Sequence, residues 1–277
     1  MRVWLNDRLV EPGEAKVSVF DHGLTVGDGI FETCKIVNGV PFALTRHLVR
    51  LQASAAGLGL PRPDLHRVRH AVTAAIDDAG RPVDGRVRIT YTSGAAPLGS
   101  RRSEAAAVLP TLVVVATGGR AWSPSAAVQV VPWPRNERGA TAGLKTVSYA
   151  ENVIALAYAL ERDAEEAIFA NTAGELCEGA GSNVVVGIDG RLVTPPLSSG
   201  CLAGVTRALL IEWCDVVEAP LPVGVLAETE EVFLASSTRD VQPVHAVDGK
   251  PVPNAPGPLT QRAAETFATR SAGDLDP

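Results

Sequence analysis

The chain has 277 residues, of which 46% are hydrophobic and 20% are charged, values typical of a globular protein with one large or two ordinary domains. Its formal net charge of −6 argues against broad nucleic-acid binding. No apolar run reaches membrane-spanning length and the N-terminus lacks a signal-peptide core, so we expect a cytoplasmic protein with no membrane partner. The four cysteines lack metal-finger spacing, and no metal site is predicted.

The first part of the chain alternates between strand and helix patterns. Strands are expected at residues 3–5, 8–10, 30–37, 86–92 and 111–117. Asn38-Gly39 is a strong type I′ turn signal at the end of the third of these strands. Apolar residues then repeat at helical spacing over residues 44–58, and a second helix is predicted over residues 64–78 with Asp64 as its N-cap.

The second part begins after the best candidate linker, the small and turn-forming residues at 118–125. We therefore predict a small N-terminal domain over residues 1–119 and a larger domain over residues 120–277. Its strands are expected at residues 128–131, 168–169, 184–186, 192–193, 216–217 and 232–235, and its helices at residues 149–162 and 204–214. An irregular charged loop is expected at residues 132–139, and the last ten residues are expected to fray. The resulting class is α+β rather than a regular βαβ array.

Lys145 is the most informative single residue. It is one of only four lysines and lies in Gly143-Leu144-Lys145-Thr146, just before a predicted helix. A lysine that forms a Schiff base, a carboxylate for a ring nitrogen and a cation for a phosphate are what pyridoxal phosphate (PLP) requires. A lone lysine at a helix start is usually an ordinary solvated residue, so this interpretation depends on the motifs around it.

Two further groups of residues supply the chemistry that PLP needs. Glu178, followed by Gly179-Ala180-Gly181-Ser182-Asn183, is the candidate partner of the ring nitrogen, and Glu175 is its competitor. A phosphate dianion favours a helix N-terminus together with a forked cation. The candidates for that role are Arg50 on the first predicted helix, the amides that open the helix at Gly204-Val205-Thr206, and the hydroxyls of Thr206, Ser237 and Thr238.

In this order, the motifs resemble the class IV aminotransferases, the fold-type-IV PLP enzymes, over nearly the whole chain. Gly27-Asp28-Gly29-Ile30-Phe31-Glu32-Thr33 resembles the N-terminal block of that family, and His47-Leu48-Val49-Arg50-Leu51 resembles its phosphate-arginine helix. The resemblance implies a small N-terminal α/β domain, a larger C-terminal mixed β domain with helices, and PLP in the cleft between them. It implies Lys145 as the Schiff-base lysine and general base and Glu178 at the ring nitrogen. Around the phosphate it implies Arg50, Val205, Thr206, Ser237 and Thr238. The family is usually homodimeric, so a homodimer is expected.

The resemblance leaves the reaction on the small-molecule amine substrate open. The run from Gly27 to Thr33 favours a 4-amino-4-deoxychorismate lyase, which gives 4-aminobenzoate and pyruvate in folate synthesis. The alternative is a transaminase of D-amino or branched-chain amino acids. D-amino-acid transaminases hold the substrate carboxylate with a tyrosine, an arginine and a histidine, and here Phe31, Leu98 and Ser100 stand at the matching positions. Other candidate carboxylate donors are Arg88, Arg101, Arg135 and Arg138.

A third hypothesis is a non-catalytic binding protein on the same fold. The presence of Lys145 and Glu178 together argues against it, because binding alone needs neither a base nor a partner for the ring nitrogen.

Overall fold

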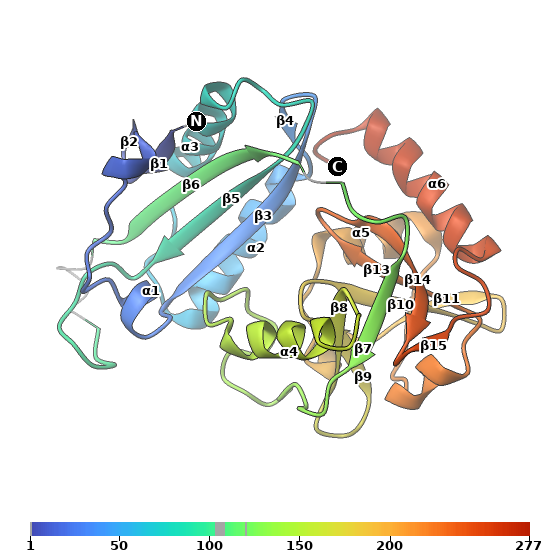
Figure 1. Ribbon diagram of the computed structural model, residues 1–277. Helices are drawn as coiled ribbons and strands as arrows, with labels where there is room; N and C mark the ends of the chain where they lie inside the picture. The colour runs from blue at the N-terminus through green and yellow to red at the C-terminus, as the bar shows by residue number, and fades with distance from the viewer. Residues whose placement is uncertain (1, 103–108, 120) are drawn as a thin grey trace. The chain divides into compact units, whose positions relative to one another are not determined.

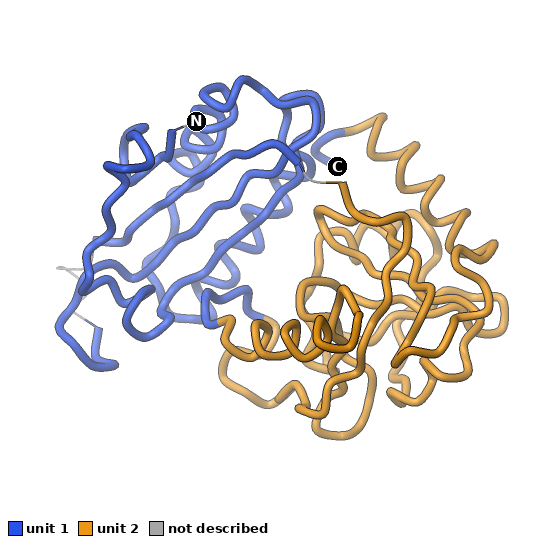
Figure 2. Tube along the Cα trace, viewed as in Figure 1, with its two compact units in different colours: residues 1–120, 144–148, 275–277 blue, residues 121–143, 149–274 orange. Residues whose placement is uncertain are grey.

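The computed structural model describes residues 2–102, 109–119 and 121–277. The chain forms two compact units (Figure 2). Unit 1 comprises Met1–Arg120, Leu144–Ser148 and Leu275–Pro277, and unit 2 comprises Ala121–Gly143 and Tyr149–Asp274. The predicted division after residue 119 differs in two short segments, because the segment with Lys145 and the last three residues both belong to unit 1.

Unit 1 is an antiparallel sheet in the order β2-β1-β6-β5-β3-β4, with two long helices on one face (Figure 1). Its strands are β1 (Val3–Leu5), β2 (Arg8–Val10), β3 (Gly29–Val37), β4 (Val40–Pro41), β5 (Asp84–Thr92) and β6 (Thr111–Gly118). Its helices are α1 (His22–Thr25), α2 (Leu44–Leu58) and α3 (Leu65–Asp78), with a 3-10 turn η1 (Pro12–Glu14). Alternate strand residues such as Ile36, Ile89 and Val114 are buried in one core with Leu48 and Val72 of the helices, as the two-residue period of a strand requires.

Local signals in unit 1 are confirmed by the structure. Asn38 and Gly39 have φ values of 50° and 76°, the left-handed conformations of a type I′ turn. Asp64 caps α3, because its side chain accepts hydrogen bonds from the N–H groups of His66 and Arg67.

The expectation that the last ten residues fray is wrong. Helix α6 (Pro258–Gly273) continues into this segment, and the residues after it bind the start of α2. The carbonyl oxygen of Leu275 accepts the N–H of Ala43 at 2.7 Å, and Oδ1 of Asp276 accepts the N–H of Thr45 at 2.7 Å. No side chain at the N-cap position of α2 satisfies its first amides, so the carboxylate of Asp276 serves as the cap.

Unit 2 is built on a mixed sheet in the order β12-β11-β10-β13-β14-β7-β8-β9, with β15 paired to β14. Its strands are β7 (Ala126–Val130), β8 (Glu166–Ala170), β9 (Leu176–Gly179), β10 (Asn183–Ile188), β11 (Arg191–Thr194), β12 (Val217–Glu218), β13 (Glu231–Ser236), β14 (Asp240–Val247) and β15 (Lys250–Pro251). Its helices are α4 (Ala150–Leu160), α5 (Val205–Cys214) and α6, with 3-10 turns η3 (Leu197–Ser199) and η4 (Val223–Ala227). The pairs β11/β12, β14/β7 and β7/β8 are parallel and the others antiparallel.

Helix α4 packs on one core of unit 2 through Ala155 and Ala159, which lie against Phe169 of β8. A second core contains Val184 and Leu234 of the central strands. Each unit thus combines a sheet with helices, and the predicted α+β class is confirmed. Strands β9, β14 and β15 and helices α1 and α6 were not predicted. The apolar signal of α6 is weak, since the helix buries only Thr260, Ala263, Phe267 and Ser271.

Candidate functional site

Lys145 is fixed to the sheet of unit 1 by its backbone. Its N–H donates to Oγ of Ser54 at 3.2 Å, and its carbonyl oxygen accepts the N–H of Phe31 at 3.0 Å. The next residue, Thr146, forms an isolated bridge with Ile30 of β3. The side chain lies on the Phe31 ring, with Nζ 4.4 Å from the ring centroid. These contacts explain why Lys145 belongs to unit 1 although the residues on both sides of its short segment belong to unit 2.

Arg50 lies beside a buried carboxylate that the sequence did not reveal. Its Nε and one terminal nitrogen donate to the two oxygens of Glu32 at 2.8 and 2.7 Å. The Nδ1 atom of His47, one helical turn before Arg50, lies 2.7 Å from the same carboxylate. Glu32 is completely buried, and the Arg50 side chain is 12% exposed. Arg50 is therefore not an ordinary solvated arginine of a helix surface, since Glu32 holds its guanidinium in one orientation.

The titration of this cluster follows from its contacts. Burial alone would raise the pKa of Glu32, but the charge of Arg50 and the hydrogen bonds from Arg50 and His47 outweigh burial and lower the pKa to about 2. Burial lowers the pKa of His47, against the raising effect of Glu32, so His47 is neutral near pH 7 and donates Nδ1–H to the carboxylate. The charges of Arg50 and Lys145 also lower the pKa of His47.

Arg88 is the second cation that contacts the Phe31 ring. It lies on β5 opposite Thr33 of β3, and its guanidinium carbon is 3.8 Å from the centroid of the Phe31 ring. Phe31 therefore contacts both Arg88 and Lys145. Of the four arginines proposed as carboxylate donors, Arg88 is the one that the structure places at the lysine within the same unit. Arg138 is 88% exposed, and Arg135 has another partner, described below.

In unit 2, Glu178 is distinguished from its competitor Glu175. Oε2 of Glu178 accepts the N–H of Leu202 at 2.8 Å, and Oε1 lies 3.4 Å from Nε of Arg135. Glu175 instead accepts a hydrogen bond from Asn171 four residues earlier and stabilises the turn before β9. Because Glu178 lies next to the segment that leads into α5, it is the better partner for a ring nitrogen.

The start of α5 meets the end of β13 at Asn183. Its Nδ2 donates to the carbonyl oxygen of Leu202, and a Cβ atom at Gly204 would collide with its Oδ1. Asn183 also pairs with Ala235, the second residue before Ser237. Thr206 is buried in the first turn of α5, and Gly204 provides no side-chain cap. The structure thus brings the opening of α5, Glu178 and the Ser237-Thr238 segment together in unit 2.

The two groups of residues fit PLP in their chemistry. Unit 1 provides an amine at Lys145 and an oriented guanidinium at Arg50. Unit 2 provides a carboxylate at Glu178 and an opening helix turn without a side-chain cap, which is a common phosphate-binding feature. Reasoning from sequence gave no role to Glu32, His47 or Asn183, although Glu32 lies inside the N-terminal block and Asn183 at the end of the Glu178 motif. It named Arg135 only as a candidate donor to a substrate carboxylate.

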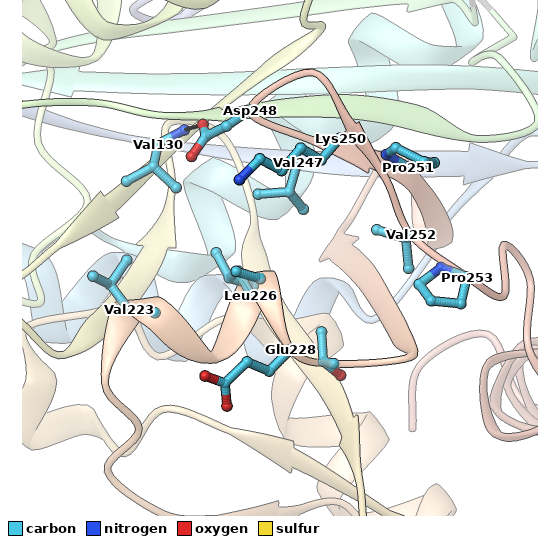
Figure 3. A pocket seen from close by; sticks show the side chains of 13 residues that line it. Val130, Val223, Leu226, Glu228, Val247, Asp248, Lys250, Pro251, Val252 and Pro253 are labelled. Carbon is cyan, nitrogen blue, oxygen red and sulfur yellow. Dashed lines mark hydrogen bonds between the residues drawn. The ribbon is translucent and has the colours of Figure 1, made fainter.

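Other features of the described residues provide no competing site. A cavity of about 280 Å³ in unit 2 is lined mainly by apolar residues such as Val223, Leu226 and Val252, with Glu228 and Lys250 among them (Figure 3). Its lining includes none of the residues proposed to bind PLP. Across the described ranges, no group of three His, Cys, Asp or Glu side chains could hold a metal ion. No helix in the same ranges is long and apolar enough to cross a membrane.

A mixed α+β fold with a lysine, a carboxylate and a phosphate-binding helix start is typical of a PLP-dependent enzyme. Residues 29–247 match the family described as Amino-transferase class IV, and the chain belongs to this family. It is therefore a PLP-dependent enzyme of the aminotransferase class.

Known proteins resemble the chain over nearly its full length. It is 30% identical to a putative branched-chain-amino-acid aminotransferase of Methanocaldococcus jannaschii, over 96% of this chain and 95% of the relative. It is 31% identical to a bifunctional aminodeoxychorismate lyase / D-amino acid transaminase of Mycobacterium tuberculosis, over 97% of this chain and 96% of the relative. The structure superimposes on the PLP-bound form of a hypothetical aminotransferase from Mycobacterium tuberculosis with a TM-score of 0.85 and 28% identity, over 97% of this chain and 98% of the other.

Proposed function

We propose that the enzyme is a PLP-dependent transaminase that acts on amino acids through their carboxylate. The observation that carries this proposal is Arg88, whose guanidinium lies on the same Phe31 ring as the amine of Lys145. A carboxylate binds best to an oriented cation that also donates hydrogen bonds. Arg88 supplies such a cation next to the proposed catalytic amine, and the names of both similar proteins include transfer of an amino group.

In this proposal the cofactor is held by the residues that the sequence motifs identify. Lys145 carries it covalently, and Glu178 accepts a hydrogen bond from its ring nitrogen. The phosphate takes the N–H groups of Val205 and Thr206 and the hydroxyls of Thr206, Ser237 and Thr238. Arg50 adds a positive charge for the phosphate, and its hydrogen bonds to Glu32 keep the guanidinium oriented. When bound, PLP supplies an electron sink for the substrate carbon that loses its proton.

Lys145 has a second role as the base. Once the substrate amine has taken its place, the free Lys145 amine accepts the proton from the substrate Cα. Free lysine has a pKa of about 10.4 and is mostly protonated near pH 7. Arg88 would hold the carboxylate during this step.

The test is a transamination assay with the PLP-loaded enzyme. D-alanine, L-leucine and other D- and L-amino acids are offered as donors with 2-oxoglutarate as acceptor, and the product amino acid is quantified. The proposal expects transfer from at least one amino acid, and a rate about 10²–10⁴-fold lower in Lys145→Ala. If no amino acid of either configuration transfers its amino group, the transaminase proposal is wrong.

A lyase acting on 4-amino-4-deoxychorismate is the second candidate. It is supported by the similarity to a bifunctional protein whose name includes that reaction and by the sequence of the N-terminal block. The same residues would serve, because Lys145 would remove the proton at the amine-bearing carbon and the enolpyruvyl group would leave as pyruvate. Formation of 4-aminobenzoate and pyruvate in equal amounts by the wild type, and of neither by Lys145→Ala, would support the lyase. If the PLP-loaded enzyme forms no pyruvate, the lyase is excluded.

We also propose that the enzyme acts as a homodimer. Unit 1 exposes apolar side chains around α1, with Phe20 at 50% and Leu24 at 68% exposure. Leu98, at 74% exposure, lies nearby, since Ala96 and Pro97 hydrogen-bond to Phe20 and His22. Apolar groups of this size are typical of protein contact surfaces. Light scattering of the purified holoenzyme should give twice the 28.9 kDa chain mass, and a monomer would contradict the proposal.

A further inference from the structure

We propose that Arg135 is a positioning residue that keeps the cofactor's proton on the ring nitrogen by holding Glu178 in its charged form. The inference rests on the proposed pairing of Glu178 with that nitrogen. It replaces the sequence-based hypothesis that Arg135 binds a substrate carboxylate, because the carboxylate it faces belongs to the protein itself.

Arg135 is held on several sides within unit 2. Its guanidinium lies 4.1 Å from the centroid of the Phe169 ring, and its backbone N–H donates to the carbonyl oxygen of Ala170 at 2.7 Å. One terminal nitrogen, NH1, donates to Oδ1 of Asn152 at 3.2 Å and to the exposed carboxylate of Glu151 at 3.3 Å. The side chain is only 15% exposed. An arginine stacked and bonded in this way loses little further freedom when it acts on a neighbour.

The Nε atom of Arg135 lies within ion-pair distance of Glu178. It is buried and has no hydrogen-bond partner among the described residues. Its ion-pair partner is Oε1 of Glu178, 3.4 Å away. The other oxygen of Glu178 accepts the N–H of Leu202. The N–H of Leu202 and the positive charge of Arg135 both stabilise the charged form of this carboxylate.

Asn152 links the same arginine to the backbone around Glu178. Its Oδ1 accepts from Arg135, and its Nδ2 donates to the carbonyl oxygen of Ala180 at 2.6 Å. Ala180 follows Glu178 by two residues, at the turn after β9. The loop that carries Arg135, the first turn of α4 and the Glu178 turn are thus joined by a short chain of hydrogen bonds. Arg135 affects both the charge and the placement of Glu178.

The charge has a chemical consequence for a proton shared between Glu178 and a ring nitrogen. The proton can reside on the nitrogen, facing a carboxylate, or on the carboxyl group, facing a neutral ring. A guanidinium paired with the carboxylate stabilises its charged form and would favour the first arrangement. Without Arg135, the carboxyl group becomes more basic and competes for the proton. The cofactor would then lose part of its capacity as an electron sink.

The experiment is ¹⁵N NMR of the holoenzyme loaded with PLP labelled at the ring nitrogen, at pH 7. Arg135→Gln and Arg135→Met remove the charge, Arg135→Lys retains it, and Arg138→Gln is the matched control at an exposed arginine of the same loop. Glu178→Gln defines the resonance of the unprotonated ring. We expect the wild type, Arg135→Lys and Arg138→Gln to show the protonated-ring resonance, and the uncharged variants to move from it toward that of Glu178→Gln.

The outcomes separate this inference from the function beneath it. If both Arg135→Gln and Arg135→Met bind PLP and keep the wild-type resonance while Glu178→Gln moves it, the role of Arg135 is refuted. If Glu178→Gln leaves the resonance unchanged, the proposed place of Glu178 is wrong. If the wild type binds no PLP, the proposed cofactor site fails. Circular dichroism of each variant confirms that a moved resonance comes from folded protein.

Discussion

Replacing Glu32 by glutamine is the sharpest test of the cluster that holds Arg50. The amide has nearly the shape of the carboxylate but no charge, and its NH₂ group cannot accept from Arg50. The guanidinium, 12% exposed, would lose its ionic partner in a buried place. The loss of folding stability should therefore be large for such a small change in side-chain volume.

The magnitude follows from the lowered pKa of Glu32. A fall from the ordinary value of 4.5 to about 2, at about 1.36 kcal/mol per pKa unit, corresponds to about 3 kcal/mol in favour of the charged form in the folded protein. This agrees with the ~3–5 kcal/mol commonly lost when one partner of a buried ion pair is removed. Because the folded pKa is the lower one, the contribution is fully present above pH 4.5 and is lost as the pH falls toward 2.

The assay is urea unfolding of wild type and Glu32→Gln without cofactor, at pH 7 and at a series of lower pH values. We expect the variant to be about 3 kcal/mol less stable at pH 7 and the difference to shrink as the pH falls below 4.5. Glu161→Gln is the control, since this glutamate is 75% exposed and should change stability by less than about 0.5 kcal/mol. A difference between wild type and Glu32→Gln that is small at pH 7, or that does not vary with pH, would refute the reasoning.

Four further predictions follow from the same structure. Lys145→Ala should lower kcat about 10²–10⁴-fold through loss of the base, and added methylamine should restore part of the rate in steady-state assays; an unchanged kcat would exclude the role. Arg88→Gln should lower kcat/KM for amino acids about 10–100-fold, because a charge-assisted hydrogen bond to the carboxylate is lost. The kcat/KM for an amine without a carboxylate should not change, and equal losses for both substrates would contradict the assignment. Gly204→Ala should weaken PLP binding by about tenfold or more, measured by fluorescence titration, because its Cβ atom would collide with Asn183. Asp276→Ala should reduce the free energy of unfolding by about 1 kcal/mol through loss of the helix cap, and an unchanged thermal midpoint would show that the cap contributes nothing.

Much of the fold could be predicted because its signals are local. The Asn38-Gly39 turn and the Asp64 cap depend on residues adjacent in sequence, and both appear where they were predicted. Leu44, Leu48 and Leu51 repeat at helical spacing because one face of α2 must be apolar. Lys145 and Glu178 were selected by motif, and the structure adds the physical reason for preferring Glu178 to Glu175.

The remaining features depend on partners distant in sequence. Nothing near Ala43 indicates that Asp276 caps its helix, and no periodicity pairs Arg135 with Glu178. Glu32 occupies a strand position where the pattern alone would favour an apolar residue, and only its contacts with Arg50 and His47 explain it. The placement of Lys145 in unit 1 likewise follows from hydrogen bonds to Ser54 and Phe31 rather than from its position along the chain.

The central claim is that Lys145 carries the cofactor in a PLP-dependent transaminase. The most direct measurement is to load the enzyme with PLP, reduce it with borohydride, digest it and locate the modified lysine by mass spectrometry. The chain has only four lysines, so the result is unambiguous. The account predicts a single phosphopyridoxyl group on Lys145, removed by prior incubation with an amino donor that converts the bound cofactor. Modification at Lys16, Lys35 or Lys250 instead, or at no lysine, would contradict it.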